Sequence, residues 1–189
     1  LKAFTEGHPI GDGAGVLVAS ILRNEFSKKG NAETSEIAED MSLTSTVFED
    51  RNVLILRATG PGGRVGKPGE AIVKLIKESN GGIARVIMID AGLKFEGEQS
   101  GKVVEGVGAA IGGPGVDKFK IEQEVTNQKV PIDAVLIKIS IEEALTTMTK
   151  EIYDGSYKAA ERVKNIILER TKPGDTVIVA GIGNCIGIG

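Results

Sequence analysis

The sequence predicts an α/β domain of three layers, α/β/α, in which helices cover both faces of a mainly parallel or mixed central sheet. Apolar segments of strand length alternate along the chain with segments whose apolar residues recur at helical spacing. The strand segments are continuously apolar, which is typical of strands buried on both faces of a parallel sheet. With 189 residues, of which 41% are hydrophobic, the chain can form one such domain with a sizeable core.

The first half of the chain predicts two helices, a hairpin and a strand. Residues 16–26 carry apolar residues at helical spacing, whereas residues 31–43 are polar and predict a linker or a short helix. Residues 44–58 read as a β-hairpin, with EDRN as the turn between TSTVF and VLILRA. An amphipathic helix is expected at residues 70–79, and a strongly apolar, central strand at residues 83–90.

The second half predicts three more strands and a long helical segment. We expect strands at residues 102–111, 133–139 and 176–180, with a short amphipathic helix that ends near Gln128 between the first two. Residues 141–170 predict a helical connector between the last two strands.

The start of this connector has a recognisable capping signal. Ser140 and Glu143 fit a capping box, and Asp154-Gly155 marks an expected break in the helix.

Taken together, these elements predict that residues 1–189 form one α/β domain. Because the chain starts at Leu1 and stops inside a loop, we expect it to be part of a longer protein.

Composition and charge exclude several function classes. The formal net charge is −3, from 23 basic and 26 acidic residues, which gives no support for a general nucleic-acid binder. No run of about 18 apolar residues occurs, so we expect no direct membrane contact by this segment. The single cysteine, Cys185, cannot form an internal disulfide and is predicted to be inert among its apolar neighbours.

Glycine-rich loops follow four of the predicted strands, at residues 59–66, 91–101, 112–118 and 181–189. Ligands of open α/β sheets bind where loops leave the carboxyl ends of the strands, and glycines allow the backbone to approach a ligand closely. Tight turns without a ligand are the alternative for any one loop. The candidate substrate-binding residues in these loops are Thr59, Gly60, Lys94, Gly113, Gly115, Lys118, Gly181, Gly183 and Asn184.

Two nucleotide-binding motifs fail when their positions are compared with the sequence. PGGRVGKP has Pro61 in place of the first glycine of a P-loop and Pro68 in place of its Ser or Thr, so no hydroxyl remains for Mg²⁺. GIGNCIG is one residue longer than the dinucleotide fingerprint, and no helix or acidic residue follows it.

Two aspartates are the candidate catalytic residues. Asp12 lies between glycines just before the first predicted helix, where a plain helix cap is the alternative. Asp90 ends the central apolar strand, where a carboxylate needs a partner to offset desolvation; a structural turn acid is the alternative. Lys94 and Lys118 lie in neighbouring loops as candidate counter-charges, or as ordinary surface lysines. The single histidine, His8, is not accompanied by a G-x-S-x-G elbow, so a serine triad is not indicated.

The two ends of the chain, read in reverse order, carry a resemblance. TVIVAGIGN from the C-terminus followed by GHPIGDGAGVLVASIL from the N-terminus resembles the start of the spore-protease and hydrogenase-maturation-protease superfamily. ATGPGGRVGKPGEAIVKLIKE, VIMIDAGLKFEGE, GGPGVDKFKIEQEV and VPIDAVLIKIS resemble later segments of the spore protease in the same order. The resemblance implies a circularly permuted, phosphorylase/hydrolase-like fold, in which residues 141–170 form the new connection.

The resemblance also implies roles for the two aspartates. The positions of Asp12 and Asp90 match the two aspartates assigned to catalysis in the spore protease. In the hydrogenase-maturation relatives, matching acids and a histidine hold a nickel ion. That histidine has no counterpart in this sequence. A divalent metal on Asp12 and Asp90 is therefore the weaker expectation, and no cofactor is expected to be required. The chain also resembles an uncharacterised archaeal family of longer proteins with an N-terminal membrane segment, which implies a soluble, cytoplasmic-facing domain of a membrane-anchored protein.

Three functions stay open on the sequence alone. The first is a peptidase-like hydrolase with Asp12 and Asp90 as an acid/base pair and a peptide or protein as substrate. The second is a non-catalytic domain of the same fold that binds a peptide or a partner, with a homo-oligomer allowed. The third is a binder of nucleotides or phosphometabolites through the glycine loops.

Overall fold

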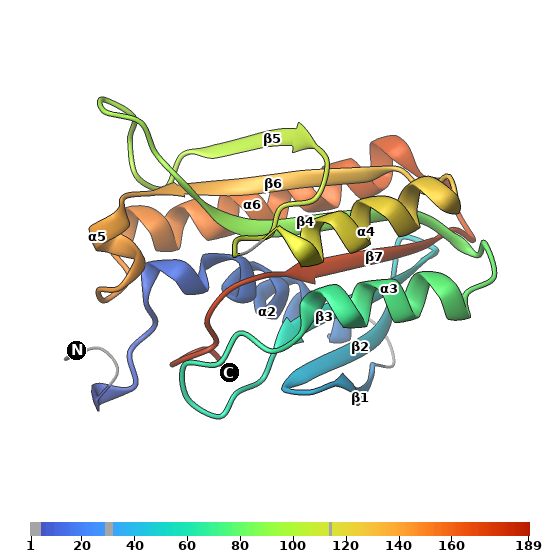
Figure 1. Cartoon of the computed structure of the whole chain (residues 1–189), viewed down its shortest axis with the longest axis horizontal. Helices are drawn as coiled ribbons and strands as arrows, with labels where there is room; N and C mark the ends of the chain where they lie inside the picture. The colour runs from blue at the N-terminus through green and yellow to red at the C-terminus, as the bar shows by residue number, and fades with distance from the viewer. Residues whose placement is uncertain (1–4, 29–31, 114) are drawn as a thin grey trace.

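The computed structural model describes residues 5–28, 32–113 and 115–189, and this part of the chain forms a mixed sheet of seven strands (Figure 1). The strands are β1 (Glu33–Ala38), β2 (Met41–Phe48), β3 (Arg51–Ala58), β4 (Ile83–Leu93), β5 (Val103–Val107), β6 (Ile132–Ile139) and β7 (Thr176–Gly181). They lie in the order β1-β2-β3-β7-β4-β6-β5. The four inner strands are parallel, and antiparallel strands complete both edges. The predicted α/β class with a mainly parallel, mixed sheet is confirmed.

Helices cover both faces of this sheet (Figure 1). In the described residues, α2 (Ala14–Ser27) and α6 (Lys150–Arg170) pack on one face, and α3 (Pro68–Glu78) and α4 (Val116–Asn127) pack on the other. Because β4 is covered on both sides, its consecutive residues 86–89 are all fully buried. No helix in these ranges is both long and apolar enough to cross a lipid bilayer.

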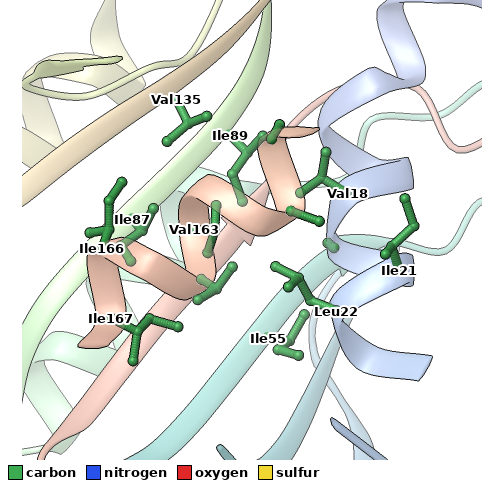
Figure 2. Packing of buried hydrophobic residues seen from close by; sticks show 14 of the residues in the cluster. Val18, Ile21, Leu22, Ile55, Ile87, Ile89, Val135, Val163, Ile166 and Ile167 are labelled. Atoms are coloured by element: carbon green, nitrogen blue, oxygen red, sulfur yellow. The ribbon is translucent and has the colours of Figure 1, made fainter. Parts of the chain in front are cut away.

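The layer formed by α2 and α6 shows how apolar periodicity produces the core. Figure 2 shows Val18 and Leu22 of α2 and Val163 of α6 packed over Ile55 and Ile89 of the sheet. All five side chains are at most 1% exposed. Burial of each such side chain stabilises the fold by about 1.5–3 kcal/mol. This packing holds α2 in place on the inner strands and so fixes the position of the residues that precede it.

The prediction of a linker or short helix for residues 31–43 is wrong over the described residues 32–43, most of which form β1 and the start of β2; residue 31 lies outside the described residues. Most of β1 is exposed, and it pairs with β2 along one edge only. An exposed edge strand buries few side chains, so its composition is polar and lacks the apolar run of an inner strand. The hairpin between β2 and β3 is confirmed, with Glu49 and Asp50 at positive φ in its turn.

The helical connector is present, but its break lies elsewhere than predicted. The capping box of Ser140 and Glu143 is confirmed, and it starts the short helix α5 (Ile141–Ala144). The chain then leaves the helix until Thr149, whose side chain caps α6. Gly155 lies inside the continuous helix α6, where a Cβ atom would stand 2.3 Å from the carbonyl oxygen of Gly101. This glycine permits close packing against a loop and does not break the helix.

Candidate functional site

The C-terminal loop and α2 meet at the carboxyl end of β7 (Figure 1). The backbone N–H of Ile182 donates to the carbonyl of Ile89 at 2.8 Å, which ties this loop to β4. A Cβ atom on Gly15 would lie 2.3 Å from the Ile89 oxygen and 2.4 Å from the Ile182 oxygen. A Cβ atom on Gly183 would lie 2.0 Å from the Asp12 oxygen. Glycine at both positions therefore lets the start of α2 pack directly on the ends of β4 and β7.

Strand β4 extends beyond β7, and Asp90 lies at the point where the two strands separate. β4 pairs with β7 up to Ile89, opposite Gly181, whereas it pairs with β6 as far as Leu93. The strand is thus longer than the predicted residues 83–90. Side chains alternate along a strand, so Asp90 projects from the same face as Met88, which packs with α3 and α4. A crevice beside the carboxyl ends of parallel strands is where open α/β sheets bind ligands.

A cavity of about 430 Å³ opens at this point. Three acidic residues line it, Asp12, Asp90 and Asp117, together with four larger apolar residues, Val65, Pro68, Ile111 and Ile182. The rest of the wall is formed by glycine and alanine, at Gly66, Ala91, Gly112, Gly113 and Gly183. Segments far apart in the sequence therefore converge on one cavity. Residue 114 of the predicted loop 112–118 lies outside the described residues.

The loop that contains Gly112 reaches the cavity by a route that the sequence does not indicate. Strand β5 ends at Val107 and not at residue 111 as predicted, and it is antiparallel to β6. Its end therefore lies at the amino ends of the inner strands, where Gly108 donates to the Ile132 carbonyl. Ala109 and Ala110 then pack in the core beneath α3 and α4, and the chain returns across the sheet to the cavity.

Asp90 is a buried carboxyl group at the base of the cavity, with 9% of its surface exposed. It accepts a hydrogen bond from the backbone N–H of Ala91 at 2.8 Å and another from the N–H of Gly112. Burial raises the pKa of the Asp90 carboxyl to about 7, and the nearby charge of Asp12 adds to the rise, while the two hydrogen bonds oppose it. Asp90 is thus present in both protonation states near neutral pH.

Asp12 reaches the same cavity from the short 3₁₀ turn η1 (Gly11–Gly13). The N-cap residue of α2 is Gly13, so Asp12 does not occupy the helix-cap position that was the alternative for it. Burial raises the pKa of the Asp12 carboxyl, and a hydrogen bond from the backbone N–H of Asn184 opposes the rise. Within the described part of the chain, neither Asp12 nor Asp90 forms an ion pair.

The junction between α5 and α6 holds the segment before Asp12. Gly11 donates its backbone N–H to the Thr146 carbonyl at 3.3 Å, and Met148 donates to the Pro9 carbonyl at 2.8 Å. Ile10 and Thr147 form an isolated β-bridge. The connector thus positions one of the two carboxyl groups.

The other predicted site residues fall into separate groups. Gly113 and Gly183 line the cavity, and Gly115 is the N-cap of α4 in a left-handed conformation. Gly181 lies beneath α2, where a Cβ atom would meet the Gly15 oxygen at 2.3 Å.

Asn184 has a bridging position beside the cavity. Its side-chain Nδ2 donates to the Gly63 carbonyl at 2.6 Å, and its Oδ1 accepts from the Ile186 N–H at 2.9 Å. Its own backbone N–H bonds Asp12. Asn184 therefore ties the loop after β3 to the C-terminal loop and holds Asp12 through the backbone.

Thr59, Gly60 and the two lysines lie outside the cavity lining. Thr59 and Gly60 line a separate hollow beside β1 and β2. Lys94 donates to the Ser100 hydroxyl at 2.8 Å, and Lys118 lies 3.9 Å from Glu122 on the same helix. No lysine or arginine is among the residues that line the cavity in the described chain.

Sequence reasoning did not identify Asp117 and Gly112 as site residues. Asp117 lies in the first turn of α4, and its side-chain atoms would stand 3.0 Å from a Cβ atom on Gly69 at the start of α3. The acidic first turn of an amphipathic helix was a visible signal for Asp117. Gly112 acts through its backbone, which leaves no signal in residue type.

The described residues contain no group of three or more His, Cys, Asp or Glu side chains close enough to hold a metal ion. His8 lies in another hollow, with Pro9 and Tyr153, and its Nε2 is 3.3 Å from Glu6. The carboxyl groups of Asp12 and Asp90 are hard oxygen ligands that suit Mg²⁺ or Mn²⁺, but in this arrangement further ligands would have to come from water or substrate.

Comparison with known proteins identifies a family without assigning an activity. A family model described as "Domain of unknown function (DUF1512) C-terminal" matches residues 10–189. No curated protein matches the sequence.

Proposed function

We propose that this chain, which belongs to the family of DUF1512 C-terminal domains, is a peptidase-like hydrolase that uses Asp12 and Asp90 as an acid/base pair. The observation that carries the proposal is the convergence of these two carboxyl groups, from distant parts of the chain, on one cavity without a cationic partner among the described residues. Two carboxyl groups in one low-dielectric site share a proton, so that one acts as the acid while the other acts as the base.

The environments of the two aspartates support separate roles. Asp90 is the more strongly desolvated group, with a pKa of about 7, so a large fraction carries the proton near neutral pH. Asp12, in its ionised form, would take a proton from a water molecule that attacks the peptide carbonyl carbon. Asp90 would protonate the leaving nitrogen as the C–N bond breaks, which yields a carboxylic acid and an amine.

The order of elements in space agrees with the resemblance to the spore-protease superfamily. β7 is followed in space by the glycine loop of residues 181–189, then by Asp12 and α2, although these segments stand at opposite ends of the chain. This arrangement supports a circularly permuted relative of those proteases.

The chemistry of the cavity wall weighs against a phosphate-bearing ligand. Three carboxyl groups face the cavity, and no lysine or arginine lines it in the described residues, so an anionic ligand would be repelled. A neutral peptide fits better, because apolar side chains such as Val65, Ile111 and Ile182 alternate with glycine backbone along the wall.

The proposal is tested by assaying peptide hydrolysis with wild-type protein, Asp12→Asn and Asp90→Asn, each with and without added Mg²⁺ or Mn²⁺. We expect each substitution to reduce turnover of a mixed peptide library by about 10²–10⁴-fold, the usual contribution of one general acid or base. Lys118→Gln, which changes an exposed residue beyond the cavity wall, serves as the control and should retain activity.

Full activity in both aspartate variants would contradict the proposal. If the wild type binds peptides without turnover, the chain is the non-catalytic binding domain, in which Asp90 serves only to fix the loop through its two backbone hydrogen bonds.

A further inference from the structure

Arg57 is a nearly buried arginine on the opposite face of the sheet from Asp90. Figure 2 shows Ile55 of β3 on the face that α2 covers. Arg57 follows Ile55 by two residues, so its side chain projects from the same face. Its cross-strand neighbours are Ser42 on one side and Gly181 on the other, which leaves small side chains at both flanks. Arg57 is 9% exposed and does not line the aspartate cavity.

The guanidinium group of Arg57 has no partner among the described residues. Its side chain donates no hydrogen bond to them and forms no ion pair, and its Nε is fully buried without an acceptor. The two Nη atoms also lack a partner in the described chain, but they are accessible to solvent. An arginine that is nine-tenths buried, with no acceptor for its Nε–H, carries a desolvation cost that the counter-charge of a ligand would offset.

The helix α2, which covers this face of the sheet, carries a further positive charge and a buried hydroxyl group without a partner in the described residues. Burial lowers the pKa of Arg57, the charge of Arg23 on α2 lowers it further, and the nearby Cys185 thiol opposes this shift. Ser20 lies one turn before Arg23 on the same side of α2, and its Oγ is buried without a hydrogen-bond partner. Arg23 donates to the side-chain oxygen of Asn24 at 3.2 Å and 3.3 Å, so the Arg57 guanidinium group and the Ser20 hydroxyl are the groups here that lack a partner among the described residues.

We propose that Arg57, with the charge of Arg23 beside it, forms a binding site for an oxyanion group, either a phosphate or a carboxylate, that is separate from the aspartate cavity. The planar guanidinium group offers paired N–H donors that match both kinds of oxyanion. Binding there would supply the acceptors that the Nη atoms of Arg57 lack and would offset the repulsion between the two arginines.

The test measures thermal unfolding midpoints at constant ionic strength while sodium chloride is replaced by sodium phosphate or by sodium acetate. For the wild type we expect a rise of about 2–4 °C with at least one of the two anions. Arg57→Met should remove most of this rise, whereas Arg64→Met, which removes an exposed arginine paired with Asp40, should retain it. General salting effects of phosphate cancel in this comparison, because they act on every variant.

A response to phosphate alone would identify a phosphoryl ligand, and a response to acetate would identify a carboxylate such as a peptide terminus. In chloride alone, Arg57→Met should unfold at the same or a higher temperature than the wild type, because it removes an unpaired buried charge. No response of the wild type to either anion, or an equal response of Arg57→Met, would overturn the site. If Arg57→Met does not fold, Arg23→Met replaces it and must weaken the response.

Discussion

At the position of Asp90, desolvation and hydrogen bonding act against each other. Two backbone N–H groups favour the carboxylate, yet burial and the charge of Asp12 outweigh them and bring the pKa to about 7. The unfolded chain holds this proton less tightly, with a pKa near 3.8. Between these two values the folded state binds more protons than the unfolded state, so the stability that Asp90 contributes is complete at low pH and is lost as the pH rises toward 7 and beyond.

We therefore predict that Asp90→Asn is more stable than the wild type at high pH. Asparagine keeps the shape of the side chain and cannot ionise, so the wild type alone should lose about 2–3 kcal/mol of unfolding free energy from this group between pH 5 and pH 8. Urea unfolding of both proteins at the two pH values measures the difference. An equal difference at pH 5 and pH 8 would show that Asp90 titrates normally in the fold.

The sequence predicted Asp12 and Asp90 as candidate residues, and both line one cavity, but it did not predict the backbone groups that bind them. An acidic residue after an apolar strand and an acidic residue between glycines can both be recognised in the sequence. The Gly112 and Asn184 N–H donors depend on where two loops return to the sheet. Such long-range placement leaves no local periodicity, and the same reason explains why Asp117 was missed.

At the scale of elements, the junction of α2 with β7 depends on glycine backbones. Gly183 has a φ of 125° and stands against the Asp12 carbonyl, so it carries both a conformational and a steric constraint. Strands and helices with strong apolar periodicity could be predicted from the sequence. The edge strand β1 could not be predicted, because its exposed side chains lack the apolar pattern of an inner strand. The break between Ala144 and Lys150 could not be predicted either, because it depends on tertiary packing.

We predict that Gly183→Ala destabilises the domain by roughly 3 kcal/mol and displaces Asp12, because a methyl group there would overlap the Asp12 carbonyl. Gly174→Ala is the matched control: its φ of 89° is also positive, but nothing lies within 4 Å of its Cβ position. This variant should cost only about 1 kcal/mol. Equal unfolding free energies of the two variants would contradict the close contact at Gly183.

At the scale of the whole molecule, three distant segments build one site. Asp12 comes from the start of the chain, Asp90 from its middle, and the loop that holds Asp12 from its end. The three-layer fold follows from the alternation of apolar strands and amphipathic helices, whereas closure of the site depends on a C-terminal loop packed against the first helix. The two carboxyl groups can influence each other only if this closure holds in solution.

The most direct test of this paired site is a ¹³C NMR titration of the Asp90 side-chain carboxyl in the wild type and in Asp12→Asn. In the wild type, the carboxyl should titrate with a pKa near 7. In Asp12→Asn the pKa should be lower, because the substitution removes the neighbouring negative charge. An Asp90 carboxyl that titrates near 3.8 and does not respond to Asp12→Asn would show that the two aspartates do not form one site.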